Sequence, residues 1–575
     1  MFDLDYLDNC SWYLFERFTA RFLMHNGYKN IQHIGKSGDK GADILAAKKD
    51  LITKKDKTYL IQCKFYSSPL PKKVIEETVN AYDYYGVDKA IIISKTDFQK
   101  KTVDEFRKKK NEGYAIEIWN LEFIKKLNDR LKTDYPFGNP KDFDEERPYQ
   151  IRTISKLHQA YNNSHINSAM IVMATGLGKT KVISEYFRER LLNDNKDKIL
   201  ILADKKNLVS QLEISFWKSL KPNTETLIWN SDVVQVNNAM LESADIIFAT
   251  NATVFKYLKK NEFFTFNFDF IVIDECHHVG DVDSMYGYIL DQLSAGQKNG
   301  PFLLGATATP FRGDSFSLSQ RFSDPLVSYS MKYGLENGYL CQVDYRLQLD
   351  NTIDWHELRN RIPKLGNSPK GINRNIFITE WDEGVIKVFH ETASEIENPK
   401  SVIFCGRIDH AKKFKNKINS FGKYSAEIIT SGQDASETAK IIGDLAAGKI
   451  NVVCTVDKLN EGIDIPDINL IVFQRVTHSR KIFIQQLGRG LRIKEGKEKV
   501  IVLDFVTDIK RVADSIKIFD NVIPRRNVEE ISINTKLSFK RLNDEANAEG
   551  AFLKEWLKDI ADVSNEDSEM HFPDY

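Results

Sequence analysis

The stretch that decides the fold is Ile171-Val-Met-Ala-Thr-Gly-Leu-Gly-Lys-Thr180. An apolar run at residues 169–173 precedes its glycines, and apolar positions at helical spacing follow them over residues 182–192. This order predicts a strand, a glycine-rich loop and a helix. Glycines let successive backbone N–H groups surround a phosphate, and the first turn of a helix adds partial positive charge. The sequence therefore predicts a phosphate-binding loop.

The side chains of this loop extend the prediction. Lys179 can reach the β- and γ-phosphates of a nucleotide, and the Thr180 hydroxyl can hold a magnesium ion. Met173 stands where the strict pattern has glycine, so the assignment depends on further motifs downstream. The backbone positions expected to surround the phosphates are Thr175, Gly176 and Gly178.

Length and composition limit the class of protein. The chain has 575 residues, too many for one hydrophobic core, which predicts about three or four domains. No apolar run approaches a membrane span and the amino terminus lacks signal-peptide features, so we expect a cytoplasmic protein without a membrane partner. Lys+Arg and Asp+Glu balance at 81 each. Local basic runs such as residues 107–110 suit either nucleic acid phosphates or a solvated helix surface.

The six cysteines lie far apart and form no Cys-x-x-Cys spacing. This arrangement predicts neither a zinc cluster nor a disulfide framework. Several of them lie in apolar, strand-like runs, where cysteine usually acts as a small buried hydrophobic residue.

The first 133 residues contain a second chemical pattern. A helical pattern carrying Glu16 opens the segment, and a glycine-rich turn runs through Asp43 into a short strand. Residues 59–65 predict another strand, whose alternation places Gln62 and Lys64 on one face. An acid on one strand end, with a polar residue and a lysine on the next, is typical of a metal-dependent nuclease. The carboxylate holds a divalent ion, and the lysine orients or activates the attacking water.

This segment resembles the Mrr-like branch of the PD-(D/E)XK nucleases. The motifs that carry the resemblance are Gly38-Asp-Lys-Gly-Ala-Asp43 and Gln62-Cys-Lys64. The resemblance implies that Asp43 is a metal ligand, that Glu16 supplies a further carboxylate and that Lys64 is the catalytic lysine. Gln62 takes the place of the usual second acid, which removes one anionic ligand for Mg²⁺ or Mn²⁺. A nuclease fold retained only for binding DNA is the alternative.

Residues 134–146 concentrate proline, glycine and acidic side chains, which predicts a linker between domains. Beyond the phosphate-binding loop, residues 270–273 predict a buried strand that ends in Asp274 and Glu275. Asp274 can complete the magnesium shell, and Glu275 can polarise the water that attacks the γ-phosphate. Other apolar strands also end in polar residues, at Thr250-Asn251 and Ala306-Thr-Ala-Thr309.

Residues 147–505 resemble superfamily 2 helicases of the DEAD/DEAH type, with the character of restriction-enzyme motor subunits. The motifs are Met173-Ala-Thr-Gly-Leu-Gly-Lys-Thr180, Asp274-Glu-Cys-His277 and Ala306-Thr-Ala-Thr-Pro-Phe-Arg312. The resemblance implies that the chain binds ATP with a magnesium ion held by Thr180 and Asp274. Gln150, at the head of the helix after the linker, would then recognise adenine. An ordinary exposed helix start is the alternative for this residue.

In this family other strand ends have further roles. Thr307 and Thr309 couple ATP hydrolysis to movement, and Thr250 and Asn251 lie near the tracked strand. Cys276 replaces the commoner alanine, a small-for-small exchange with little expected effect.

A second lobe repeats the alternation of strands and helices. Arg489 and Arg492 are three residues apart and share a helix face. By resemblance, they are arginine fingers that reach the γ-phosphate, and Gly462 and Asp464 help to close the nucleotide site. ATP would bind between the lobes, so that binding closes the cleft and hydrolysis reopens it and moves the gripped strand.

The predicted fold class is α/β: a restriction-endonuclease-like domain, two RecA-like parallel-sheet lobes and a carboxy-terminal helical region. A polar stretch with prolines and glycines, residues 351–375, favours an insertion or a bridge between the lobes. The expected segments are a nuclease domain (1–133), a linker (134–146), a first lobe (147–345), a connecting segment (346–384), a second lobe (385–508) and a helical tail (509–575).

These patterns together predict an ATP-dependent DNA helicase or translocase coupled to a divalent-metal-dependent endonuclease, of the kind used in restriction or anti-phage defence. DNA, duplex or single-stranded, is the expected partner, and a partner subunit of a defence system fits the same interpretation. The first alternative is a DNA-remodelling translocase whose nuclease-like domain only binds DNA. An RNA-directed helicase is the second, and the nuclease resemblance argues against it.

Overall fold

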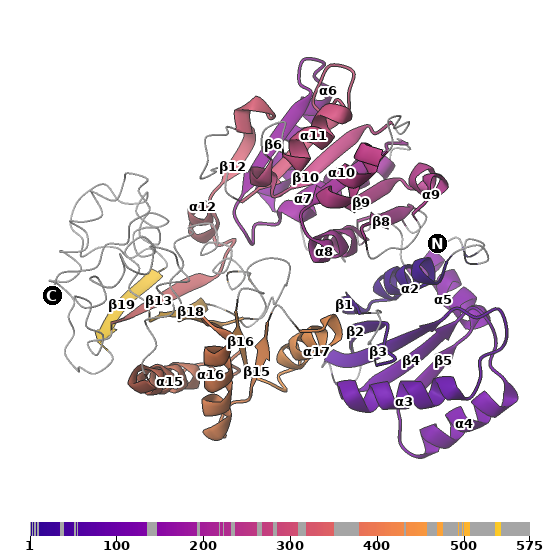
Figure 1. The fold of residues 1–575 in the computed structure, drawn as a ribbon, viewed down its shortest axis with the longest axis vertical. Coiled ribbons are helices and arrows are strands. Elements are labelled where there is room, and N and C mark those ends of the chain that lie inside the picture. Colours follow the sequence, from indigo (N-terminus) through magenta and orange to yellow (C-terminus); the bar gives the residue numbers. More distant parts are fainter. Residues whose placement is uncertain are drawn as a thin grey trace. The chain divides into compact units, whose positions relative to one another are not determined.

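The structure is a computed structural model of the chain, drawn as a ribbon in Figure 1. The residues that it describes are 2, 4, 7, 11–34, 40–50, 53, 56–134, 147–192, 196–217, 219–221, 224–231, 236–260, 267–279, 284–308, 318–349, 379–430, 433–456, 468–474, 491, 493, 497, 499–505 and 535–541. The predicted site residues outside this description are Thr309, Gly462, Asp464, Arg489 and Arg492. Packing divides the chain into two compact units, of which the first contains two sheets and the second contains a third.

An amino-terminal sheet is built from β1 (Lys29–His33), β2 (Ile44–Lys49), β3 (Asp56–Lys64), β4 (Lys89–Ser94) and β5 (Ile116–Trp119), in that spatial order. The first three strands are antiparallel, whereas β3, β4 and β5 are parallel. The helices are α2 (Trp12–His25), α3 (Lys73–Tyr85), α4 (Lys100–Asn111) and α5 (Leu121–Asp134). Helices α2 and α5 pack into one hydrophobic cluster and α3 and α4 into another, so that both faces of the sheet are covered (Figure 1).

Local sequence explains the ends of these elements. Helix α2 begins at Trp12, where the Ser11 side chain accepts a hydrogen bond from the backbone N–H of Leu14. Helix α3 ends at Tyr85 and is capped by Gly86, whose φ of +58° lies in the left-handed region that glycine adopts without strain. The buried isoleucines of β4 suit a central strand that is covered on both faces.

The second sheet contains β6 (Ser168–Met173), β7 (Ile199–Ala203), β8 (Thr226–Trp229), β9 (Ile246–Thr250), β10 (Phe270–Asp274), β11 (Phe302–Thr307) and β12 (Pro325–Tyr329). Its order is β12-β6-β11-β10-β7-β9-β8. The accompanying helices are α6 (Pro148–Asn162), α7 (Lys179–Leu192), α8 (Lys206–Trp217), α9 (Asn238–Ser243), α10 (Asn251–Lys260), η2 (Cys276–His278), α11 (Met285–Gln292), η3 (Leu318–Gln320) and α12 (Met331–Glu336).

Strands β6, β11, β10, β7 and β9 pair in parallel, each with the next. Parallel strands bring their carboxyl ends to one edge of the sheet, and that edge is where ligands bind in folds of this kind. The phosphate loop and the polar strand ends predicted from sequence therefore share one edge. The strands predicted at residues 169–173 and 270–273 are confirmed to within one residue at each end.

The third sheet contains β13 (Gln342–Leu349), β14 (Ser401–Phe404), β15 (Ala426–Ile429), β16 (Val452–Thr455), β17 (Leu470–Phe473), β18 (Lys499–Asp504) and β19 (Thr535–Arg541). Its order is β15-β16-β14-β17-β18-β13-β19, and its strand pairs are parallel. The helices of this part of the chain are α15 (Thr379–Ser394), α16 (Ile408–Ser420) and α17 (Ala435–Ala446).

Two expected segments are corrected by this sheet. The boundary placed at residue 345 cuts through β13, which pairs with β18 and so belongs to the second lobe. Within the tail expected to be helical, Thr535–Arg541 forms β19. The apolar residues Leu537 and Phe539 alternate with polar ones, a period-two pattern that favours a strand over a helix.

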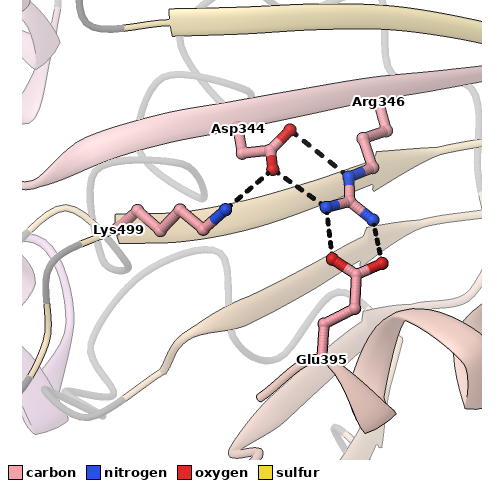
Figure 2. Close-up of polar contacts among 4 residues, drawn as sticks. All are labelled: Asp344, Arg346, Glu395 and Lys499. Atoms are coloured by element: carbon pink, nitrogen blue, oxygen red, sulfur yellow. Dashed lines mark hydrogen bonds and ion pairs between the residues drawn. The ribbon is translucent and has the colours of Figure 1, made fainter.

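A cluster of charges joins three elements of the second lobe (Figure 2). The Arg346 guanidinium donates to both carboxylate oxygens of Glu395, each at 2.6 Å, and at 2.9 Å to Oδ2 of Asp344. Lys499 donates to the same Asp344 oxygen at 3.1 Å. Asp344 is buried, so the two cations compensate its charge and tie β13 to β18 and α15.

The five cysteines within the described part of the chain are buried and free, as the sequence predicts. They are Cys63, Cys276, Cys341, Cys405 and Cys454. Among the described residues, no helix is both long enough and apolar enough to cross a membrane.

Candidate nuclease and nucleotide sites

A pocket of about 710 Å³ opens where β3 leaves the amino-terminal sheet. Its lining includes Asp43, Gln62 and Lys64, so the fold brings together three residues predicted from two separate motifs. It also includes Glu77, which the sequence did not indicate.

Asp43 is fixed at the junction of β2 and β3. Its backbone N–H donates to the carbonyl of Ile61 at 3.0 Å, and its Oδ2 accepts the N–H of Cys63 at 2.6 Å. The residue is only 5% exposed. A backbone donor therefore holds this carboxylate in one orientation at the wall of the pocket.

The Gln62 amide is oriented by Thr78 of α3. The Thr78 hydroxyl donates to Oε1 of Gln62 and also lies 2.8 Å from the carbonyl of Val74. A carbonyl oxygen has two lone pairs, so Oε1 can accept this hydrogen bond and still offer a lone pair to a metal. The Gln62 amide nitrogen is buried near Gly41 and has no hydrogen bond among the described residues.

Lys64 and Glu77 face each other across this pocket. The Lys64 ammonium lies 3.1 Å from Oε2 of Glu77, and Lys73 lies 3.3 Å from the other oxygen. Burial acts to raise the pKa of Glu77, but the two lysines outweigh it and hold this pKa below its usual value. Glu77 is on a helix thirteen residues beyond Lys64, and no short motif in the sequence indicated that the two residues meet.

Glu16 does not line the pocket. It is buried on α2, and its carboxylate lies 2.7 Å from Nε2 of His33 on β1. The structure therefore places this predicted carboxylate against the neighbouring strand, and its part in metal binding stays a prediction.

The donor set suits one hard cation. The pocket offers carboxylate oxygens from Asp43 and Glu77 and an amide oxygen from Gln62. Mg²⁺ is typically held by one or two carboxylates while it keeps several waters. No cluster of three or more His, Cys, Asp or Glu ligands occurs within the described residues.

The phosphate loop of the second sheet has the backbone that its glycines predict. Gly176 and Gly178 have φ values of +91° and +87°. A Cβ on Gly178 would lie 2.6 Å from Nε2 of Gln150, so this side chain packs directly against the loop. Gln150 is buried rather than exposed, and its Oε1 accepts the N–H of Arg147 at 3.0 Å. Thr175 and Thr180 are half-buried around the same loop.

Lys179 lies on the first turn of α7 and pairs with an acid from β10. Its ammonium donates to Oε1 of Glu275 at 2.5 Å. Burial raises the pKa of Asp274 to about 6, although Lys179 opposes this change. Burial also acts to raise the pKa of Glu275, but Lys179 and His277 outweigh it and keep that residue anionic. A lysine, a helix start and two acids at one strand edge fit the phosphates of a nucleotide with its magnesium ion.

Glu275 has a strained backbone and links two strand ends. Its φ of +51° is rare for a residue with a side chain and is common at functional sites. The Nδ1 atom of His277 lies 2.7 Å from the Thr307 hydroxyl and 3.2 Å from the Glu275 carboxylate. The ends of β10 and β11 are therefore joined through buried side chains.

Asp204 connects the ends of β7, β9 and β10, and no role was predicted for it from the sequence. Its Oδ1 accepts the Asn251 amide N–H at 3.1 Å, and its Oδ2 lies 3.4 Å from Nε2 of His278. Beside it, the Thr250 hydroxyl lies 2.8 Å from that of Thr253. Thr250 and Asn251, which are expected near the tracked strand, therefore lie next to Asp204 at the end of β7.

Three family models match successive parts of the chain. Residues 7–127 match the restriction endonuclease model, residues 144–312 match the type III restriction enzyme res subunit and residues 384–494 match the helicase conserved C-terminal domain. The chain therefore matches a restriction endonuclease model and, after it, two models of motor-type domains, in the order that the resemblance predicted.

Relatives among characterised proteins agree with this architecture. The chain is 28% identical to the type I restriction enzyme EcoAI endonuclease subunit of Escherichia coli, over 64% of the chain and 47% of that protein. It is 23% identical to the DNA 3'-5' translocase XPB2 of Sulfurisphaera tokodaii, over 67% of the chain and 87% of that protein. The chain thus spans about half the length of the restriction subunit that it matches.

A solved structure shows the same fold. The ATP-dependent type ISP restriction-modification enzyme LlaBIII bound to DNA matches 95% of the chain and 41% of its own length, with a TM-score of 0.53 and 17% identity. This likeness supports a nuclease-type domain followed by two parallel-sheet lobes.

Proposed function

We propose that the chain is an ATP-driven DNA translocase that carries a divalent-metal-dependent endonuclease, acting in restriction or anti-phage defence. The observation that carries the proposal is the pocket in which Asp43, Gln62 and Lys64 converge, in a chain that also holds a complete phosphate loop. The relatives' names concern restriction endonuclease subunits and translocases, which supports both halves of the proposal.

At the nuclease pocket, the protein supplies ligands and a cation. Asp43 and the Gln62 oxygen would hold the metal, with Glu77 as the nearest further carboxylate. A bound divalent ion would stabilise the negative charge that develops on the scissile phosphate. Lys64 orients the attacking water and balances charge on the phosphodiester, once DNA phosphate competes with Glu77 for its ammonium.

At the motor site, the phosphates of ATP would likewise compete with a carboxylate for a lysine. The terminal phosphates of ATP would attract Lys179, which pairs with Glu275 in the structure. Glu275 is then available to position and polarise the attacking water, and Asp274 and Thr180 would hold the magnesium ion. Gln150 packs on the loop, where it can recognise the adenine edge. Arg489 and Arg492 are proposed to complete the site from the second lobe.

In a second candidate function, the motor works in the same way but the amino-terminal domain does not cleave DNA. Gln62 in place of an acid weakens the anionic ligand set, so the amino-terminal domain would only bind DNA and the output would be remodelling. We also propose that a partner subunit of a defence system supplies recognition of the target, and that the protein works in the cytoplasm. An RNA-directed motor is distinguished by comparing ATPase stimulation by duplex DNA, single-stranded DNA and RNA.

The deciding experiment is cleavage of circular and linear plasmid DNA with Mg²⁺ or Mn²⁺, with and without ATP. Cleavage that needs ATP and is lost in both Lys64→Ala and Lys179→Ala supports the proposal. Lys126→Ala is the matched control, because Lys126 is exposed on α5 and, within the described part of the chain, pairs with Glu122 of the same helix. If ATP is hydrolysed on DNA and no phosphodiester is cut with either metal, the remodelling function replaces it.

A further inference from the structure

Helix α2 has two buried sides with different chemistry. Its aromatic residues Phe15 and Phe22 pack in the core of the amino-terminal domain. Arg17 and Arg21 lie on the same helix and are each only 6% exposed. Arginine is rarely buried unless its charge is paired, so these two side chains indicate a specific contact surface.

The partner of Arg17 comes from the first motor lobe. Its guanidinium forms an ion pair with Glu213, which is on α8 and fully buried. Glu213 is held in turn by the Thr226 hydroxyl, which donates to Oε1 at 2.7 Å. The Arg17 guanidinium also lies 5.2 Å from the ring centre of Trp217, within the range of a cation–π contact.

Arg21 binds backbone groups of the same lobe. Its Nη1 donates to the carbonyl of Thr224 at 2.6 Å, and its Nη2 donates to the carbonyl of Lys221. Both carbonyls belong to the connection between α8 and β8, and the Lys221 carbonyl also accepts the N–H of Thr224 at 3.0 Å. A fork-shaped guanidinium satisfies two such acceptors at once, with a geometry that lysine cannot reproduce.

Trp217 supplies the apolar part of the contact. It is 1% exposed and belongs to the hydrophobic cluster formed by α2, α5 and the amino-terminal sheet. Its indole N–H lies 3.4 Å from the Thr226 hydroxyl that also contacts Glu213. The contact therefore combines a buried aromatic anchor with compensated charges, which is the composition of a stable interface rather than of a transient one.

We infer that Arg17, Arg21, Glu213 and Trp217 form a permanent internal docking surface, which fixes the amino-terminal domain to the first motor lobe so that the two move as one body. The consequence for cutting rests on the proposed function: the nuclease pocket would be carried along DNA at a fixed distance from the lobe that binds ATP. Helix α8 follows β7 and Asp204, so the surface is also close in sequence to the residues that join the strand ends.

The docking surface is tested by cutting the chain between the amino-terminal domain and the first motor lobe. A protease site is placed between α5 and α6 of the full-length protein, the chain is cut there, and association of the two fragments is measured by gel filtration and by titration. We expect the fragments to stay together. Separation of the wild-type fragments at micromolar concentration would overturn the inference.

Variants identify the residues responsible. In the cut protein, Arg17→Gln or Glu213→Gln leaves one buried charge unpaired, so each is expected to weaken association by about a hundredfold. The double variant removes both charges and should bind no more weakly than either single variant. Effects that multiply, or single variants that bind like the wild type, would contradict the ion pair. Arg107→Gln, an exposed arginine on α4, is the matched control and should have no effect.

This readout does not depend on cleavage. A protein that never cuts DNA but whose severed fragments stay together refutes the proposed nuclease and leaves the docking surface standing. A protein that cuts DNA with ATP but whose fragments separate refutes the docking surface alone.

Discussion

At the scale of single residues, Thr78 determines what Gln62 can offer to a metal. The Thr78 hydroxyl donates to Oε1 of Gln62 and so fixes the orientation of the amide whose oxygen we propose as a metal ligand. Thr78→Val keeps the shape of the side chain and removes this donor. We expect the affinity for Mn²⁺, measured by calorimetry, to fall by about ten- to a hundredfold, as it does when other outer-shell partners of metal ligands are lost.

Thr78→Ser retains the hydroxyl and should restore metal affinity close to that of the wild type. Equal affinity in the valine and serine variants would show that Gln62 does not depend on Thr78. Both variants are also compared in cleavage, so that metal binding and catalysis are separated.

Gly178 is a second position where the structure places a strict demand on the residue, because the backbone conformation and the packing both require glycine. Its φ is +87°, and a Cβ there would lie 2.6 Å from the Gln150 amide. Gly178→Ala should therefore distort the phosphate loop and lower ATP hydrolysis by about ten- to a hundredfold, through about 1–3 kcal/mol of strain. Gly443→Ala is the control, because nothing lies within 4 Å of a Cβ added at this glycine of α17. Unchanged hydrolysis in Gly178→Ala would argue against the loop geometry.

At the scale of elements, the cluster around Arg346 makes the second lobe sensitive to acid. Burial acts to raise the pKa of Asp344, but Arg346 and Lys499 outweigh it, so this pKa lies below its usual value. A carboxylate with a lowered pKa stabilises the fold above its unfolded pKa of about 3.9, and this stabilisation is lost as pH falls through the folded pKa. We expect thermal stability of the wild type to decline steeply below about pH 4.

Asp344→Asn tests whether the cluster around Arg346 is the cause of this acid sensitivity. The substitution should lower the free energy of unfolding of this lobe by about 1–3 kcal/mol at neutral pH and flatten its dependence on acid. Asp409→Asn is the matched control, because its ion pair with Arg407 is exposed and should contribute about 0–1 kcal/mol. Calorimetry from pH 3 to pH 7 checks both variants, and parallel curves for Asp344→Asn and the wild type would exclude the cluster as the cause.

Some features of the elements could be predicted from the sequence, and others could not. Strand ends such as Asp274 and Thr307 were recognisable because parallel strands bring sequence-distant carboxyl ends to one edge. Strand β13 was divided between two lobes, because its pairing with β18 joins Gln342 to Lys499, far apart in the sequence, and leaves no local trace. Glu77 was missed for a similar reason, because its contact with Lys64 depends on how α3 packs on the sheet.

At the scale of the whole molecule, docking of the nuclease domain on the first motor lobe makes cutting depend on the motor of the same chain. A mixture of Lys64→Ala and Lys179→Ala tests this dependence, because each variant keeps the site that the other lacks. If the pocket is carried by its own lobe through Arg17 and Glu213, the motor of one chain cannot move the nuclease of another. We therefore expect the mixture to cut plasmid DNA no faster than either variant alone. Cleavage restored toward the wild-type rate would instead show that nuclease and motor act between chains.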